Sequence, residues 1–166
     1  SPYQSFSTFA GNPYFIDLEE LIEEGMLTRE ECDSMDFGDD EDDIDYEDQY
    51  QNRYILLTMA YERSNISQNP DYQRFVEENR WWLDDYALFM ALKNFFKGQC
   101  WNEWPQDIRL RWGYSMDYYR RELYFDIEFQ MFLQYWFFKQ YWRLKAYANE
   151  NHIRIIGDIP IYVAMD

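Results

Sequence analysis

The sequence has very few of the residues that most often form metal centres and nucleophilic triads. Among 166 residues there is one histidine, His152, and there are two cysteines, Cys32 and Cys100. A single histidine excludes an HExxH zinc site, and the cysteines lack the CxxC spacing of zinc sites and disulfide frameworks. A Ser-His-Asp triad would have to use His152, at a predicted junction between a helix and a strand. This cysteine usage favours a reducing compartment, and we expect a cytoplasmic protein.

Positive charge and phosphate-binding glycine motifs are also scarce. The 15 lysines and arginines are outnumbered by 32 aspartates and glutamates, which gives a formal net charge of -17 at pH 7. A surface of this charge repels phosphate backbones, so we expect no nucleic-acid partner. The sequence contains neither a GxxxxGK[ST] nor a GxGxxG pattern, and nothing in it calls for a cofactor.

Long apolar runs are missing as well. The richest apolar stretch, residues 129–142, is interrupted by glutamines and a lysine. It falls well short of the ~20 continuous apolar residues of a membrane-spanning helix, so we expect no membrane partner. The chain opens with Ser1-Pro2-Tyr3-Gln4 rather than with a basic and then an apolar segment, so no signal peptide is predicted. The missing initiator methionine leads us to expect a processed or truncated product.

Aromatic residues, by contrast, are abundant. They make up 22% of the chain, and hydrophobic residues together make up 47%, which predicts a folded chain with a sizeable core. The 16 tyrosines and 7 tryptophans combine a large apolar area with a polar group. They could therefore serve either a core or a surface that stacks on sugars.

Two capping patterns predict short helices near the start of the chain. In the first, Asp17 is expected to accept hydrogen bonds from first-turn amides, and Glu20 to reach back to the Asp17 amide. Gly25 is expected to end this helix. The same pattern at residues 28–31 predicts a second helix, and residues 26–27, Met-Leu, are expected to pack as a hydrophobic link between the two.

Residues 33–48 are crowded with carboxylates, which suggests a calcium loop of the D-x-D-x-D-G type. The spacing argues against a metal site, because Met35 and Phe37 precede Gly38 where alternating oxygen ligands would stand. We therefore interpret the segment as a solvated, self-repelling loop and as the best candidate for a boundary in the chain.

Apolar residues at helical spacing continue through residues 49–64, 70–97 and 116–149. Asn69 is the expected N-cap of the second of these helices, and Gly98 its stop. The third helix would span about 50 Å if unbroken, so we expect it to bend or to contain a break. A stripe along the second helix is interpreted as core rather than as a ligand site. The stripe consists of Phe75, Trp82, Tyr86, Phe89 and Leu92.

The end of the chain changes from helical to extended character. Residues 153–156 form a β-branched run typical of a buried strand, and residues 161–163 resume extended character. Asp158 lies at the carboxyl end of the first run. If that strand belongs to a β/α barrel, a carboxylate there is a candidate functional group, although an aspartate at a strand end is also a common turn residue.

Specific motifs occur at both ends of the chain. The first is SPYQSFS followed by FAGNP, and the last is IRIIGDIPIYVA. These motifs resemble the amylomaltase family, the 4-alpha-glucanotransferases of the alpha-amylase-like superfamily. The resemblance covers essentially the whole chain apart from the acidic loop. The matching residues are Ser1 to Ser7, Phe9 to Pro13, Ile16 to Leu18, Trp82 to Lys93, Trp101, Trp104 and Pro105, Phe129 to Tyr135, Tyr147 to Asn149, and Ile153 to Ala164.

The resemblance implies an α/β fold, a partial (β/α)8 TIM barrel with a large, mainly helical insertion subdomain, in which this chain is mostly α. Residues 1–13 would form a loop of the barrel's active-site face. Residues 14–150 would form the helical subdomain and a barrel helix, with the acidic loop at 33–48. Residues 151–166 would supply a barrel strand ending at Asp158.

The resemblance also implies substrate-binding residues but no catalytic ones. Tyr3 matches the family's tyrosine that lines the sugar site, with Ser1 beside it, and Asp158 matches an aspartate that lies near the bound sugar. The family's reaction resembles retaining glycoside chemistry, in which a nucleophilic carboxylate and an acid/base carboxylate transfer a glucan segment to a second sugar. Both carboxylates, and a third assisting aspartate, lie downstream of the matching segment in the family. No residue of this chain is therefore assigned to catalysis, and no metal is expected.

The expected partners are malto-oligosaccharides and glucans derived from starch or glycogen. The isolated chain is expected to be inactive, and to aggregate or form oligomers, because a partial barrel exposes strand edges and apolar surface. The alternative is a non-catalytic carbohydrate-binding or scaffold module; a purely structural helical protein would leave the strand around Asp158 without a purpose. One departure from the family is that Asn151-His152 stands where a glycine is usual. Asn151 can take the left-handed conformation there at some cost, or the loop can shift by a residue without disturbing Asp158.

Overall fold

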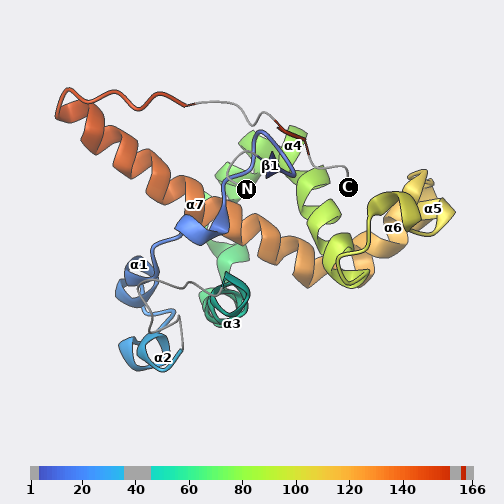
Figure 1. Cartoon of the computed structure of the whole chain (residues 1–166), viewed down its shortest axis with the longest axis horizontal. Coiled ribbons are helices and arrows are strands. Elements are labelled where there is room, and N and C mark those ends of the chain that lie inside the picture. The colour runs from blue at the N-terminus through green and yellow to red at the C-terminus, as the bar shows by residue number, and fades with distance from the viewer. Residues whose placement is uncertain (1–3, 36–45, 158–161, 164–166) are drawn as a thin grey trace.

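The computed structural model describes residues 4–35, 46–157 and 162–163, and most of these residues are helical. Apart from three 3₁₀ helices and two short strands, the described residues form α-helices of very different lengths, as Figure 1 shows. In chain order the elements are β1 (Gln4–Ser5), η1 (Pro13–Phe15), α1 (Leu18–Glu23), α2 (Arg29–Asp33), α3 (Tyr46–Ser64), η2 (Ile66–Gln68), α4 (Pro70–Phe95), η3 (Trp101–Glu103), α5 (Gln106–Arg109), α6 (Gly113–Glu122), α7 (Tyr124–Glu150) and β2 (Tyr162–Val163).

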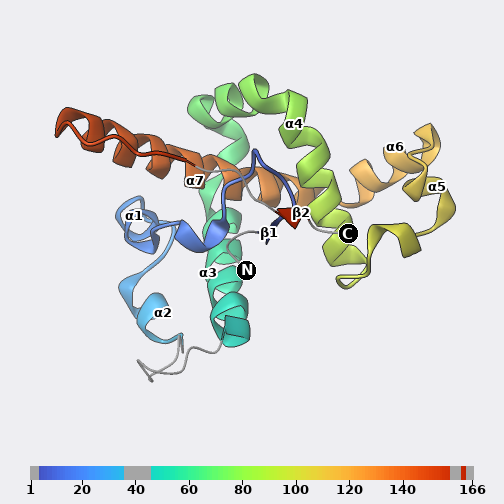
Figure 2. The same cartoon turned by 45° about the horizontal axis from the view of Figure 1, so that its top comes forward.

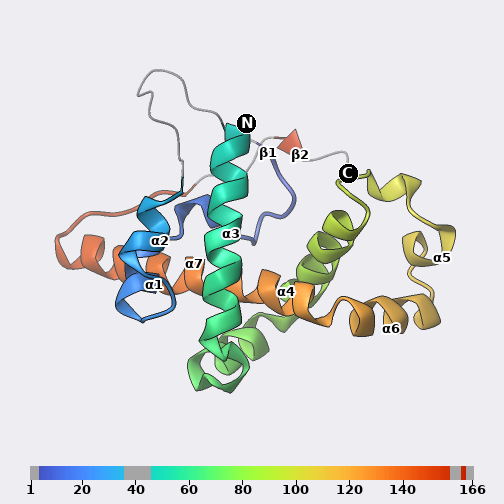
Figure 3. The same cartoon turned by 90° about the horizontal axis from the view of Figure 1, so that it is seen from below.

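Helix α7 is the axis around which the other elements are arranged. Helices α3 and α4 both pack against it, and α3 crosses it near its middle (Figure 3). Helices α1 and α2 lie on one side of α3, and α5 and α6 lie beyond α4 on the other (Figures 1 and 3). Within the described ranges, no helix combines the length and apolar character that crossing a membrane requires.

The predicted helix ends are largely confirmed. Asn69 caps α4 by accepting from the Asp71 and Tyr72 amides at 2.9 and 3.3 Å. Thr28 and Glu31 form the reciprocal capping box of α2. Gly25 and Gly98 follow α1 and α4 with φ of 75° and 77°, a left-handed conformation that glycine adopts without steric cost.

The long helix predicted over residues 116–149 contains the expected break. Helix α6 ends at Glu122, and α7 begins at Tyr124, with Leu123 between them at φ -103° and ψ 24°. Leu123 is buried in a cluster with residues from α4, α5 and α6. The chain therefore changes direction where it seats this side chain in the core.

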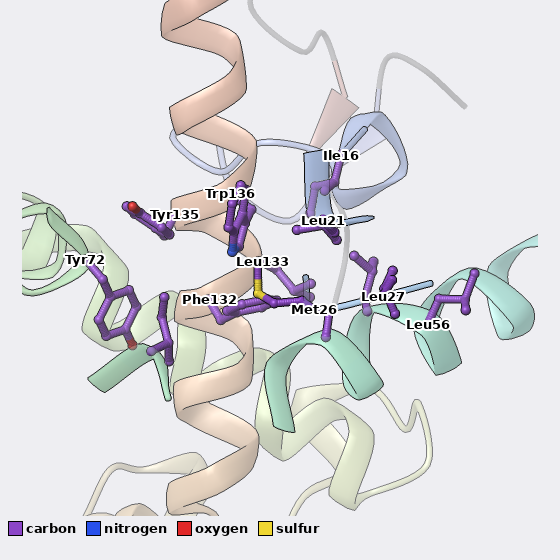
Figure 4. Close-up of a cluster of buried hydrophobic side chains, with 13 residues drawn as sticks. Ile16, Leu21, Met26, Leu27, Leu56, Tyr72, Phe132, Leu133, Tyr135 and Trp136 are labelled. Carbon is purple, nitrogen blue, oxygen red and sulfur yellow. The ribbon is translucent and has the colours of Figure 1, made fainter. Parts of the chain in front are cut away.

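Two hydrophobic clusters hold the helices together. The larger one joins α1, α3, α4 and the middle of α7 around Phe132 and Leu133, both fully buried, and Figure 4 shows it with Met26 and Leu27 inserted as the predicted link. The smaller cluster joins the end of α4 to α6. The predicted stripe on α4 belongs to this packing: Trp82 and Leu92 are buried, and Phe75 and Phe89 are packed against the clusters.

The strand predicted at residues 153–156 is wrong for this chain. Ile153, Ile155 and Ile156 are 60, 41 and 91% exposed, in a segment that turns back from the end of α7 (Figure 1). A strand needs hydrogen-bonding neighbours. In the described part of the chain, β1 is the only such neighbour, and it pairs instead with β2, which lies in the second predicted extended run.

Two further predictions meet the structure near residues 33–48 and 151–152. Most of the acidic segment, residues 36–45, lies outside the described residues; α2 ends at Asp33 before it and α3 begins at Tyr46 after it. At the end of α7 the left-handed residue is His152, with φ 62°, whereas Asn151 has φ -89°. The helix thus continues one residue further than predicted, because the Asn151 amide still bonds to α7 carbonyls.

Candidate functional site

The three predicted substrate-binding residues, Ser1, Tyr3 and Asp158, lie outside the described residues. The segments next to them in the sequence are described. Strand β1 follows Tyr3 directly, and it pairs in parallel with β2, with Gln4 opposite Tyr162 and Ser5 opposite Val163. The structure therefore brings together the two ends of the chain that carry the predicted motifs (Figure 2).

Residues 5–9, after β1, form a tight polar turn. The Ser5 hydroxyl donates to the Ser7 carbonyl at 2.6 Å and accepts from the Ser7 amide at 3.2 Å. The Phe9 amide in turn donates to the Ser7 hydroxyl at 3.2 Å. Short hydroxyl side chains that bond to backbone two residues away stabilise such turns.

Aromatic side chains attach this turn to α4. The Phe6 ring lies 6.0 Å from that of Phe89, and the Phe9 ring meets Trp81 edge to face at 4.7 Å between centroids. Lys93 places its ammonium group 5.8 Å from the Phe6 ring centroid. Edge-to-face and cation–π contacts at these distances are favourable, so the turn is held against one side of α4.

Two glutamines attach the following residues to α7. Gln134 accepts from the Gly11 amide at 2.8 Å and donates to the Gly11 carbonyl at 3.0 Å. Gln140 accepts from the Asp17 amide at 2.7 Å and donates to the Asp17 carbonyl at 3.0 Å. In the sequence these glutamines stand out only as interruptions of an apolar run. A polar side chain in the middle of a buried aromatic helix was the available signal, since such a group needs a partner.

The start of α1 departs from the predicted capping box. Asp17 caps the helix by accepting from the Glu19 amide at 3.0 Å, as expected. Glu20 does not reach back to the Asp17 amide, because that amide is bonded to Gln140 and the Glu20 carboxylate accepts from Arg143. Burial raises the pKa of Glu20 above its ordinary value, and the Arg143 charge opposes this shift.

The same corner contains a half-buried arginine. Arg53 on α3 donates to the Ile16 carbonyl, and burial lowers the pKa of Arg53. Together with the Gln140 contacts on Asp17, this bond fixes the backbone that leads from η1 into α1. In the described residues, no group of three or more histidines, cysteines, aspartates or glutamates is arranged to hold a metal ion. What these contacts can do is position a segment; none of them supplies a nucleophile.

Comparisons with known proteins extend over the whole chain. A family described as 4-alpha-glucanotransferase matches residues 1–166. The chain is 46% identical over 166 residues to a 4-alpha-glucanotransferase of Clostridium butyricum, and 44% identical over 168 residues to one of Streptococcus pneumoniae. All of this chain is covered in both cases, but only 34% and 33% of those proteins.

A solved structure of an amylomaltase has a similar fold. An amylomaltase from Streptococcus agalactiae in complex with acarbose superposes with a TM-score of 0.89 at 36% sequence identity. The match covers 100% of this chain and 34% of the amylomaltase chain, so this chain spans about a third of the length of the proteins it matches. The family match over residues 1–166 and these identities show that the chain belongs to the 4-alpha-glucanotransferase family.

Proposed function

We propose that this chain is part of an enzyme that transfers alpha-1,4-glucan segments to glucose or malto-oligosaccharide acceptors. The observation that carries the proposal is the family match over all 166 residues. The substrates would be malto-oligosaccharides and glucans derived from starch or glycogen, and the compartment the cytoplasm. The related amylomaltase was solved with acarbose, which supports an oligosaccharide ligand for this protein.

In this proposal the chain is part of a β/α barrel with an inserted helical subdomain. Residues 1–13 form a loop at the active-site face, residues 14–150 the helical subdomain and a barrel helix, and residues 151–166 supply a barrel strand; of the described residues in this last range, Tyr162 and Val163 form the strand β2. The parallel pairing of β1 with β2 supports this division, because parallel strands require a long crossover, and here the crossover is the whole helical region. Active sites of such barrels lie at the carboxyl ends of the strands, next to Asp158 in the sequence.

The chemistry proposed is retaining double displacement. A carboxylate nucleophile forms a glycosyl-enzyme intermediate, and one acid/base carboxylate first protonates the leaving sugar and then deprotonates the acceptor hydroxyl. Those two carboxylates are not assigned to this chain. Its own contribution is substrate binding through Ser1, Tyr3 and Asp158, so the isolated chain binds sugar at most and does not turn it over.

Incubation of the full-length protein with maltotriose tests the proposal. Transfer of a two-glucose segment from one maltotriose to another releases glucose and forms maltopentaose, both measurable by chromatography. Products limited to glucose and maltose would indicate hydrolysis, and acarbose binding without any product would favour the carbohydrate-binding module instead. Either result would overturn the transferase assignment.

The proposed binding residues need a matched control in the same assay. Tyr3→Ala should raise the KM for maltotriose, because a ring that stacks on a sugar is lost. Tyr118→Ala removes a half-exposed tyrosine on α6 and should leave the KM unchanged. Equal effects of the two substitutions would remove Tyr3 from the site.

A further inference from the structure

The backbone of the N-terminal segment is bound by α7 at two residues, Gly11 and Asp17. Each is bonded through both its amide and its carbonyl to one glutamine carboxamide, Gln134 or Gln140, at distances of 2.7 to 3.0 Å. Asp17 is extended, with φ -72° and ψ 118°, so its amide and carbonyl are bonded as a neighbouring β-strand would bond them. The two glutamines are six residues apart, about 9 Å along the helix axis.

Burial makes the Gln134 contact specific. The Gln134 side chain is fully buried, and a buried carboxamide is costly unless its donor and acceptor are both paired. Gly11 supplies both partners. One turn earlier on α7, Gln130 is almost as deeply buried, but its side-chain oxygen accepts no hydrogen bond from the described residues. Burial of a glutamine on α7 therefore does not by itself hold the N-terminal segment.

Steric contact with Phe137 fixes how closely the N-terminal segment approaches α7. A Cβ atom on Gly11 would lie only 1.9 Å from Cδ1 of Phe137, so the bare backbone rests directly on that ring. Hydrogen bonds from Gln134 set the position of Gly11 along α7, and the Phe137 ring sets its distance from the helix. The backbone between Gly11 and Asp17 consequently has one register on α7.

Helix α7 is connected to both strands of the parallel pair. The segment that it binds leads back through the turn on α4 to β1, and its own C-terminus leads on to β2. We propose that Gln134 and Gln140 are positioning residues for the N-terminal segment, holding β1, which directly follows Tyr3 in the sequence, in register with β2. The role of Tyr3 rests on the proposed function, whereas the placement of the segment rests on the contacts above.

Replacement of Gln134 in the full-length protein tests this role, with Gln130 as the matched control. Gln134→Met keeps the volume and removes both hydrogen bonds; we expect kcat/KM for maltotriose to fall about tenfold or more, with a raised KM, because small misplacements of binding groups are costly. Gln130→Met alters a residue of the same type and burial on the same helix, and should change kcat/KM less than about twofold. The assay is run well below the melting temperature of each variant, so that loss of folded protein does not lower the apparent kcat.

A pH profile separates positioning from general stability. In Gln134→Glu the neutral carboxylic acid can accept from the Gly11 amide and donate to the Gly11 carbonyl, whereas the carboxylate cannot donate. The activity of this variant relative to wild type should therefore be highest at low pH and decline as the introduced group ionises. Over the same pH range, deuterium exchange of the Gly11 amide should become faster. Gln140→Met, at a half-buried residue, is the second variant if Gln134→Met fails to fold.

The outcomes distinguish the two proposals. If the wild-type protein transfers no glucan, the proposed function fails, while amide exchange at Gly11 and Asp17 still reports on their hydrogen bonds to Gln134 and Gln140. If the wild type is active and both the Gln134 and Gln140 variants keep its KM and its exchange rates, the positioning role is overturned.

Discussion

Gly11 is the residue at which the N-terminal segment comes closest to α7. Gly11→Ala would place a methyl group against the Phe137 ring at 1.9 Å, so either the ring or the backbone must move. Overpacking of this kind costs about 1–3 kcal/mol, and we expect the free energy of unfolding in urea to fall by that amount. Gly113→Ala is the control, since nothing lies within 4 Å of its Cβ, and it should not destabilise. Equal urea midpoints for the two variants would contradict this account.

The ion pair between Glu31 and Arg63 makes the stability of the fold depend on pH. Arg63 donates to both Glu31 oxygens at 2.8 and 2.9 Å, and these bonds, followed by the Thr28 amide, lower the pKa of Glu31 from 4.5 to about 2. A carboxylate with a lowered pKa stabilises the fold fully above its unfolded value and loses this contribution as the pH falls from 4.5 to about 2.

We therefore expect the melting temperature of the wild type to decline more steeply than that of Glu31→Gln between pH 5 and pH 2. The stabilisation is modest, because both side chains are partly exposed and surface pairs are screened by water. Glu30→Gln removes the same charge from the adjacent residue and should keep the wild-type slope. Parallel slopes for the wild type and Glu31→Gln in thermal melts would be evidence against the ion pair.

Whether the hydrogen-bond partner of a side chain could be predicted depends on how far apart the two residues are in the sequence. The Thr28 capping box was predictable because donor and acceptor are three residues apart. The partners of Glu20, Gln134 and Gln140 were not predictable, because each lies 123 residues away, across the interface between α7 and the N-terminal segment. The substrate-binding roles are inferred from the family resemblance alone and stay predictions. They concern Ser1, Tyr3 and Asp158.

At the scale of elements, the sequence predicts helices far better than strands. A helix satisfies its own backbone, so periodicity and caps located α3 and α4. The length of the third predicted helix indicated a break without giving its position. The β-branched run at residues 153–156 has the composition of a buried strand, yet no strand of the described chain is available to pair with it. Composition indicates that a segment can be a strand, and a neighbour decides whether it is one.

The cap of α4 provides a test at this scale. Asn69→Ala removes the oxygen that accepts from the Asp71 and Tyr72 amides, and we expect a loss of about 1 kcal/mol in the free energy of unfolding. Asn69→Asp keeps an acceptor at the helix N-terminus and should retain most of the stability. Chemical denaturation of both variants measures the difference. A loss as large for aspartate as for alanine would mean that the cap contributes through some other contact.

For the whole molecule, exposed apolar surface and net charge have opposite effects on self-association. Large hydrophobic side chains are exposed on η1, on α7 and after its end; they include Phe15 at 75%, Phe125 at 73%, Tyr147 at 65% and Ile156 at 91%. Such surface favours self-association, so the isolated 166-residue chain is expected to form oligomers. The net charge of -17 opposes this by mutual repulsion.

Salt dependence separates these two forces. Screening shortens the reach of charge repulsion to about 10 Å at 0.1 M salt and leaves apolar attraction intact, so the mass measured by light scattering should rise with both salt and protein concentration. Ile153→Ser with Ile156→Ser should reduce association, whereas Ile55→Ser, at a half-exposed residue on α3, should not. We expect the proposed full-length barrel to cover this surface, in which case the dependence of association on salt should disappear. A monomeric chain with a sharp cooperative melt at low and high salt would show instead that these 166 residues fold and stay separate without any further part of the protein.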